Sequence, residues 1–388
     1  MLFIFLGSAD FINRYYYCVY IAFAIFIITP GRKFYMDKCF AVLVALSVAL
    51  LIFSPEAHGS LTNAIRPFTY PLCYFMGCNL FNRGEFVEYD LDESQNQITN
   101  AIYIVSAGFT IHFLLNMITN YDSTGRNGID FWSGLPMSAT GQATLACFAI
   151  AIIAAFLFSN VGKVKKIIAI FLIALIVAYN LVLAGRTLFV LLGVMFLVAF
   201  IFRCIATRKI MVNALALTLV IFVAILIVYN ANLFGIKTSF ENSNFYSRFF
   251  GIDATTSIQE DARGQNKIEH LKRFLDHLWG GGKIKADYGH SAHDLYLDTH
   301  DNAGIFAFIG VVAYVCISIS HGITFVKNKL YTLNVRQLVF CTYVVVNIQF
   351  WIEPILKGMP WLFATYCFID GMVSFSNKKY SVVRNKNI

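Results

Sequence analysis

Charge is the scarcest feature of this 388-residue chain. Only 13% of its residues are Asp, Glu, Lys or Arg, whereas roughly a quarter are charged in soluble domains. Hydrophobic residues make up 58% of the chain, and the mean hydropathy is +0.65. This composition excludes an ordinary soluble domain and indicates an all-α, polytopic integral membrane protein. The net charge of +8 comes from basic residues between apolar runs and not from a basic tail, so we expect no nucleic-acid partner.

Several other features are missing. Residues 1–6 are apolar where a cleavable signal peptide would begin with basic residues, so we expect no such signal. The cysteines lie in or beside the apolar runs, and Cys73 and Cys78 lack a second pair at zinc spacing, which argues against a disulfide framework or a zinc module. No internal repeat or linker divides the chain, so we expect one transmembrane domain over residues 1–388.

Long apolar runs recur along the sequence. A membrane span needs roughly 17 to 25 apolar residues to cross the hydrocarbon core. Eleven runs meet or approach this length, and one further span upstream would make twelve. Their approximate ranges are 15–30, 39–54, 66–82, 98–119, 138–159, 166–184, 186–202, 211–234, 303–324, 337–355 and 360–376.

The basic residues predict which way the chain is threaded. Lys and Arg in short loops stay on the cytoplasmic side. With a cytoplasmic C-terminus, alternate loops on that side hold most of these residues, and the N-terminus and the long loop 235–302 face outward. The opposite short segments hold only Arg14, Arg66, Arg126, Arg186 and Lys357.

The long outer loop contains one clear helical pattern, from Asn266 to Trp279. Apolar residues recur at helical spacing, and Gly280–Gly282 ends the pattern. We expect an amphipathic helix that lies on the membrane or caps a cavity. Its apolar positions are Ile268, Leu271, Phe274, Leu275 and Leu278.

Titratable residues gather where this loop enters the ninth span. His293 can exchange a proton near neutral pH. If the segment is already helical, Asp294 and Asp298 share the face next to His293, and a carboxylate fixes the tautomer of the imidazole. The alternative is a polar loop end with exposed histidines and no function.

A metal site is a second alternative for the same segment. His290, His293, His300 and Asp301 include metal-ligating residue types. Their spacing matches no zinc signature.

Isolated arginines are expected on the outer side. Arg186 follows a tight turn, Arg66 opens the third span, and Arg248 and Arg263 lie in the long loop. An arginine at membrane depth costs about 2.5 to 3.5 kcal/mol, so it usually faces a cavity or a counter-charge. Guanidinium binds phosphate through paired hydrogen bonds. Snorkelling toward the membrane surface explains Arg14 and Arg126.

Glu353 and Pro354 end the tenth span on the same side. The carboxylate either pairs with one of the outer arginines as a structural clasp or orients a sugar hydroxyl. We favour the clasp.

These residues, in this order, resemble the bacterial O-antigen polymerase and O-antigen ligase superfamily. Asp294 and Ala307 depart from the ligase pattern, which weakens a ligase assignment more than it weakens membership of the superfamily. The likeness is carried by His293, Asp294, Gly304 and Ala307 at the ligase spacing, by Ala184–Thr187, by Arg263 ahead of Trp279–Gly282, by Glu353–Pro354 before Lys357–Trp361, and by Asp130–Pro136.

The resemblance implies a membrane glycosyltransferase of a GT-C-like class in the bacterial inner membrane, with its active site facing the periplasm and with no metal or other cofactor. The donor is a glycan on undecaprenyl pyrophosphate. The acceptor is a second lipid-linked repeat unit in a polymerase and the lipid A core in a ligase. Implied partners are the lipid bilayer and a polysaccharide chain-length regulator.

The resemblance also implies roles for the site residues. Arg186 and Arg263 hold the pyrophosphate with help from Arg66 or Arg248. His293 either accepts the acceptor's proton or contacts the pyrophosphate as a cation. The remaining substrate-binding candidates are Asp294, Tyr296, Asp298 and Glu353.

A lipid-linked oligosaccharide flippase or another transporter is the alternative from a different class. Its usual marks are inverted repeats and charge near mid-membrane, whereas most charge here is expected at the outer face.

Overall fold

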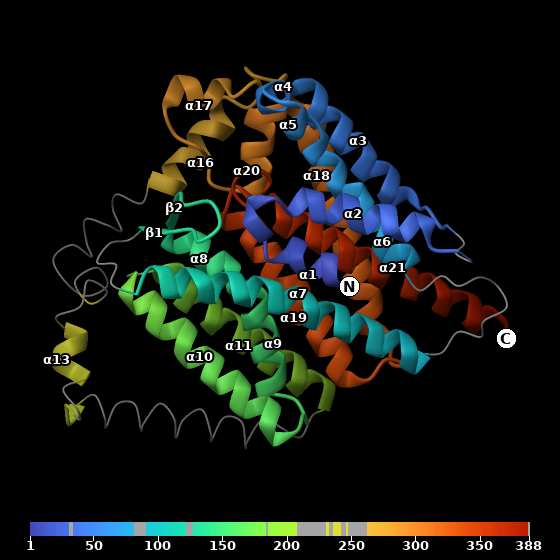
Figure 1. The fold of residues 1–388 in the computed structure, drawn as a ribbon, viewed down its shortest axis with the longest axis vertical. Helices are drawn as coiled ribbons and strands as arrows, with labels where there is room; N and C mark the ends of the chain where they lie inside the picture. Colours follow the sequence, from blue (N-terminus) through green and yellow to red (C-terminus); the bar gives the residue numbers. More distant parts are fainter. Residues whose placement is uncertain are drawn as a thin grey trace. The chain divides into compact units, whose positions relative to one another are not determined.

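The computed structural model is an all-α structure with one small hairpin, and its apolar helices are those of a multi-pass membrane protein. It describes residues 1–30, 34–80, 91–121, 127–183, 185–207, 230–232, 236–241, 246 and 262–386. The chain divides into two compact units, residues 1–112 with 262–388, and residues 113–261. We describe each unit by itself (Figure 1).

The first unit contains the two ends of the chain and most of its helices. Its elements are α1 (Leu2–Ser8), α2 (Tyr15–Ile28), α3 (Lys38–Phe53), α4 (Pro55–His58), α5 (Leu61–Ile65), α6 (Thr69–Asn79), most of α7 (Leu91–Thr119), α16 (Ala262–Lys272), α17 (Lys283–Tyr288), α18 (Leu295–Lys327), α19 (Leu333–Ile352), α20 (Ile355–Gly358) and α21 (Pro360–Lys386), with 3₁₀ turns at Phe11–Asn13 and Arg66–Phe68.

The core of this unit is built around α21 and α18. Helix α21 packs along α6, and α18 packs against α3, α19 and α21. Gly77 of α6 and Gly371 of α21 face each other's backbones so closely that a Cβ on Gly77 would collide with the Phe368 carbonyl oxygen. Buried aromatic rings fill the space between these helices, among them Tyr74, Tyr314, Phe363 and Tyr366.

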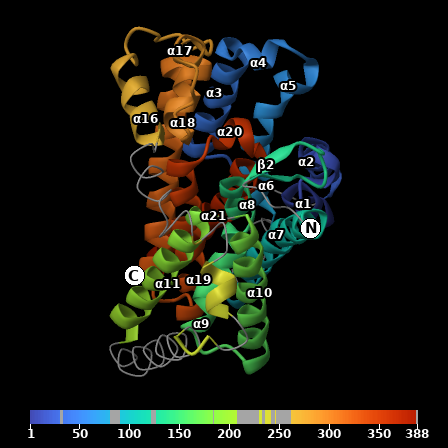
Figure 2. The ribbon, with the colours of Figure 1, turned by 90° about the vertical axis from the view of Figure 1, so that its left-hand side faces the viewer.

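Three connections of the first unit meet at one end of its bundle. They are the segment after α3, the segment from α17 into α18, and the turn at α20 before α21. The Lys357 side chain of α20 reaches Glu56 of α4 at 2.7 Å, and both views show α4, α5 and α17 at this end (Figure 2). The basic residues of the short loops predict that these same connections lie outside the membrane.

The second unit comprises α8 (Ala139–Leu145), α9 (Cys147–Leu157), α10 (Lys163–Val182), α11 (Arg186–Thr207), α13 (Ile236–Glu241) and the hairpin of β1 (Asn127–Ile129) and β2 (Pro136–Ser138). The strands pair antiparallel, with Gly128 opposite Met137. Helix α9 packs on α10 and α11. Ser138 caps α8 by accepting from the Gly141 amide at 3.2 Å.

Within the described residues, five helices are long and apolar enough to cross a membrane, and the bent pair α8–α9 would make six. The five are α7, α10, α11, α18 and α19. The expected spans at 15–30 and 39–54 are the shorter apolar helices α2 and α3. The span expected at 66–82 is broken into short helices around Pro67 and Pro71, and 211–234 lies almost wholly outside the described residues.

The amphipathic helix of the outer loop is shorter than the sequence indicates. Helix α16 covers Ala262–Lys272, not Asn266–Trp279, and residues 273–279 form turns. The reason is the contact of the next segment with α18, where Ile305 donates to the Leu278 carbonyl at 2.8 Å. Most apolar side chains of the predicted helix stay on the surface: Ile268, Leu271, Leu275, Leu278 and Trp279 are exposed, whereas Phe274 stacks on His300.

Candidate functional site

His293 lies in a turn before α18, not in the helix. Its φ of 60° is a left-handed conformation that is uncommon for a residue other than glycine. Helix α18 begins at Leu295, and Asp294 is its N-cap, accepting from the Leu297 amide at 2.7 Å. The helical arrangement of His293 with Asp294 and Asp298 is therefore wrong.

Two carboxylates hold the backbone of this turn. Asp298 accepts from the Ala292 amide through Oδ1 and from the Asp294 amide through Oδ2, both at 3.0 Å. Asp294 is 2% exposed and is committed to the helix N-terminus. Among the described residues no hydrogen bond joins either carboxylate to the His293 ring. These aspartates position the histidine through its backbone.

Cations of α16 lie beside the turn. Lys267 Nζ lies 3.3 Å from Asp294 Oδ2 and donates to the Trp351 carbonyl at 2.6 Å. Arg263 lies 3.9 Å from Glu353 and donates to the Ile352 carbonyl at 3.5 Å. Both side chains thus reach the last carbonyls of α19, where a helix end attracts positive charge. The Arg263–Glu353 pair has the geometry of the clasp that the sequence suggests.

These surroundings favour the neutral form of His293. Burial lowers the pKa of the imidazole, and the nearby positive charges of Arg263, Lys267 and Lys285 lower it further. Both effects favour the neutral ring, which is the form that can accept a proton. This favours proton acceptance over a role as a cation. Tyr296 lies near the same turn with its ring 4.9 Å from that of Trp351.

Two glycines fix the start of α18 against the end of the long loop. Gly304 has a φ of 74° inside α18, and Gly280 has a φ of 71°. A Cβ on Gly304 would lie 2.6 Å from the Leu278 carbonyl oxygen, and one on Gly280 would collide with the Gly304 amide. The close approach lets Gly282 donate to the Asp301 carbonyl at 2.7 Å.

The Asp301 carboxylate serves the neighbouring helix. Its Oδ1 accepts from the Ile284 amide at 2.8 Å at the start of α17. The His300 ring stacks on Phe274 with centroids 3.7 Å apart. Neither side chain joins His290 and His293 in a ligand set, and the described part of the chain holds no cluster of three or more His, Cys, Asp or Glu arranged for a metal ion. The metal alternative gains no support.

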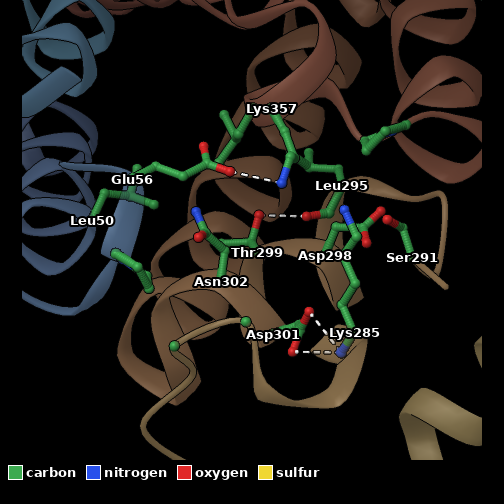
Figure 3. A pocket seen from close by; sticks show the side chains of 15 residues that line it. Leu50, Glu56, Lys285, Ser291, Leu295, Asp298, Thr299, Asp301, Asn302 and Lys357 are labelled. Carbon is green, nitrogen blue, oxygen red and sulfur yellow. Dashed lines mark hydrogen bonds and ion pairs between the residues drawn. The ribbon is translucent and has the colours of Figure 1, made fainter. Parts of the chain in front are cut away.

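A cavity of about 230 Å³ opens beside this segment, between α4, α17, the start of α18 and α20. Figure 3 shows charged and polar side chains on its wall, and Lys357 reaches across to Glu56. Burial opposes the charge on Lys357, but the hydrogen bond and charge of Glu56 raise its pKa overall. The polar lining residues are Glu56, Lys285, Ser291, Asp298, Thr299, Asp301, Asn302 and Lys357.

A smaller cavity of about 60 Å³ adjoins the first and shares Glu56, Asn302 and Lys357 with it. Arg66 lines this second cavity and lies over the Tyr16 ring, with Cζ 5.5 Å from the centroid. Its Nε is buried and makes no hydrogen bond within the described residues. The Glu56–Lys357 pair therefore lies where the two cavities meet.

The other two arginines that were named as site candidates are Arg186 and Arg248. Arg186 is the half-buried first residue of α11 in the second unit. The turn before it is tightly packed, because a Cβ on Gly185 would lie 2.8 Å from Asn180 Oδ1. Arg248 lies outside the described residues.

The segment 130–136 of the resemblance is also in the second unit. Asp130 is buried and accepts from the Ser133 amide and hydroxyl at 2.8 Å. Asn116 donates to Asp130 at 3.3 Å and accepts from the Phe131 amide at 2.7 Å. These hydrogen bonds therefore hold segment 130–136 in the turn of the hairpin.

Sequence reasoning missed Glu56, Lys267 and Lys285. Lys357 was named only as an outer positive charge and as the first residue of the segment Lys357–Trp361 in the resemblance. Its signal was its place shortly after Glu353 on the expected outer side. Glu56 follows the second span directly, but no local pattern links it to a residue so far along the chain.

Comparison of the sequence with protein-family models and with curated proteins found no match.

Proposed function

We propose that this chain is a membrane glycosyltransferase of the O-antigen polymerase kind. It joins oligosaccharide repeat units that are carried on undecaprenyl pyrophosphate. The observation that carries the proposal is His293, a neutral base held in a strained turn beside Arg263, Lys267 and Lys285. A base next to several cations suits the transfer of a sugar from a phosphate leaving group.

The chemistry follows from these charges. The acceptor hydroxyl attacks the anomeric carbon of the donor sugar, and His293 accepts the hydroxyl proton as the new carbon–oxygen bond forms. The bond between the anomeric carbon and the pyrophosphate breaks, and its electron pair stays on the phosphate oxygen. Arg263 and Arg66 stabilise the charge that develops there. We assign Arg186 and Arg248 to the same leaving group, and the transfer is metal-independent.

The proposal includes the finer topology. We assign the chain eleven or twelve spans, a GT-C-like class, and a bacterial inner-membrane location with the cluster around His293 facing the periplasm. Its substrates are a lipid-linked donor and a lipid-linked acceptor, and a chain-length regulator is its protein partner. The common end of α4, α17 and α20 supports this orientation, because the basic residues of the short loops predict that all three connections lie on the outer side.

A reconstituted assay tests the proposal. The full chain in liposomes is given lipid-linked repeat units only, and the products are separated on a polysaccharide gel. We expect a ladder of polymer that is lost in His293→Ala while the protein still inserts. An O-antigen ligase would yield product only when lipid A core is added. No ladder under either condition would contradict the glycosyltransferase proposal.

A lipid-linked oligosaccharide transporter is a second candidate, because one buried network favours it. Asp370 of α21 is fully buried and accepts from Tyr343 at 2.7 Å. His321 Nδ1 lies 3.1 Å from the same carboxylate. Ser374 donates to Asp37 at 3.0 Å and lies 3.5 Å from His321 Nε2. Ionisable residues inside a membrane bundle mark ion or proton pathways in transporters.

Substitution of Asp370 distinguishes the transporter from the polymerase. A transporter driven by protons would lose movement of lipid-linked oligosaccharide across the liposome membrane in Asp370→Asn. The polymerase proposal expects Asp370→Asn to keep the ladder if the protein is correctly folded. Tyr343→Phe is the matched control, because it removes one hydrogen bond to Asp370 without removing the carboxylate.

A further inference from the structure

The larger cavity has a wall of mixed charge. Lys285 and Lys357 supply two ammonium groups, and Glu56, Asp298 and Asp301 supply three carboxylates. Thr299 and Asn302 add uncharged polar groups. Its charged side chains thus sum to a net negative charge at neutral pH.

This balance of charges determines which kind of ligand the cavity can bind. A phosphate group entering the cavity would meet three carboxylates and only two ammonium groups. A neutral ligand with many hydroxyls avoids that repulsion. Each hydroxyl both donates and accepts, so it can pair with an ammonium group and a carboxylate at once.

Figure 3 shows how the groups are placed. Glu56 and Lys357 lie on one side of the cavity, and Lys285 and Asp298 lie on another, with Asn302 and Thr299 between them. Asp298 and Asp301 are already fixed by backbone amides, so their positions do not depend on a ligand. The half-exposed side chains of Glu56 and Lys357 remain adjustable.

The size restricts the ligand further. At about 230 Å³ the cavity is smaller than the roughly 300 to 1,000 Å³ of typical drug-sized sites. It therefore accommodates a single ring and not a whole oligosaccharide. Arg66 lies in the adjoining cavity, where a phosphate bonded to that ring would find a cation.

We propose that this cavity binds one neutral sugar ring, the one bonded to the pyrophosphate of the lipid-linked glycan, with Glu56 and Lys357 holding neighbouring hydroxyls. This inference rests on the proposed function for the identity of the glycan. The Glu56–Lys357 pair lies at the junction of the larger cavity, which would hold the sugar, and the smaller cavity, which would hold the phosphate. The sugar inserts between the Glu56 and Lys357 side chains, which position it.

A binding experiment with two probes tests the sugar site. The full chain in detergent is titrated with the oligosaccharide released from lipid-linked repeat units, followed by saturation-transfer NMR, and separately with inorganic pyrophosphate, followed by phosphorus NMR. We expect Glu56→Ala and Lys357→Met to weaken oligosaccharide binding by about tenfold or more, the loss of one hydrogen bond to a charged group. Glu56→Gln, which keeps the shape and the hydrogen bond acceptor, should bind more tightly than Glu56→Ala.

A matched ion pair provides the control. Lys272 contacts Glu269 at 2.8 Å on the surface of α16, away from the cavity wall. Glu269→Ala and Lys272→Met should leave oligosaccharide binding unchanged. If Glu56→Ala instead tightens pyrophosphate binding and leaves oligosaccharide binding unchanged, the cavity is an anion site and the inference is overturned.

The outcomes separate this inference from the proposed function. If the wild-type chain makes no ladder but binds the oligosaccharide in a Glu56-dependent manner, the sugar site stands and the polymerase proposal fails. If the chain makes a ladder while Glu56→Ala and Lys357→Met bind and polymerise as the wild type does, the sugar site is wrong and the polymerase proposal stands.

Discussion

The backbones of Gly280 and Gly304 pack directly against each other, with positive φ at both residues. This contact joins the end of the long loop to the start of α18, and it lets Gly281 donate to the Asn302 carbonyl at 3.1 Å. Asn302 in turn lines both cavities. The glycine contact therefore holds the backbone that shapes the two cavities, although neither glycine takes part in the proposed reaction.

The glycine contact leads to a stability prediction. Gly304→Ala places a Cβ against the Leu278 carbonyl and strains a positive φ, so we expect a loss of about 1 to 3 kcal/mol. Gly193→Ala is the control, because nothing lies within 4 Å of its Cβ position and alanine favours the helix by about 1 kcal/mol. Thermal unfolding of the purified protein measures both, and equal effects would contradict the packing described.

Replacement of His293 should remove the chemical step. A positioned general base contributes about 10²- to 10⁴-fold, so His293→Ala should lower the rate of polymer formation by that factor. Binding of the oligosaccharide should change little, because His293 does not line the cavity. A turnover assay beside the NMR titration separates the two effects, and a variant that still polymerises at the wild-type rate rules His293 out as the base.

The pH dependence follows from the lowered pKa of His293. A base must be unprotonated to act, so the rate should be constant above the pKa and fall as the pH drops through it, below about 6.5. Lys267→Gln removes one of the charges that lower this pKa. The acid limb of the profile should then move to higher pH, and an unmoved limb would assign it to another group.

Asp294 is expected to act on the helix and not on the imidazole. Asn is as good an N-cap as Asp, whereas Ala costs about 1 kcal/mol. Asp294→Asn should therefore keep most of the activity, and Asp294→Ala should lower stability and activity together. If Asp294→Asn loses activity while its unfolding temperature is unchanged, the carboxylate charge acts in the reaction itself or through its ion pair with Lys267, and not through the helix cap.

Arg186 is tested separately because it belongs to the second unit. A guanidinium that binds phosphate through two hydrogen bonds is not replaced well by an ammonium group. We expect Arg186→Ala to abolish polymer and Arg186→Lys to restore only a small part of it. Wild-type polymer from Arg186→Ala would remove Arg186 from the site.

Composition and periodicity predict the all-α membrane class well, because long apolar runs leave few other structures. Composition and periodicity do not predict the ends of a helix where tertiary contacts determine them. The helical spacing from Asn266 to Trp279 is real, yet α16 ends at Lys272 because the following backbone pairs with α18. Pro67 and Pro71 signalled the break in the third span, which the structure contains.

The site was predictable only in part for a similar reason. His293, Arg263 and Glu353 could be named from the sequence, because their side chains suit the proposed chemistry and all three are expected on the outer side of the membrane. Glu56 and Lys357 form their pair across most of the chain length, and no sequence spacing indicates such a contact. The left-handed turn at His293 was equally hidden, because most left-handed turns are signalled by glycine or asparagine.

The most direct measurement is the product ladder from the purified full chain and lipid-linked repeat units alone, compared between the wild type and His293→Ala at matched protein amounts. We expect a ladder from the wild type, lost with His293→Ala and kept with the Lys272→Met control. A ladder of equal length and yield from His293→Ala would contradict sugar transfer at this site.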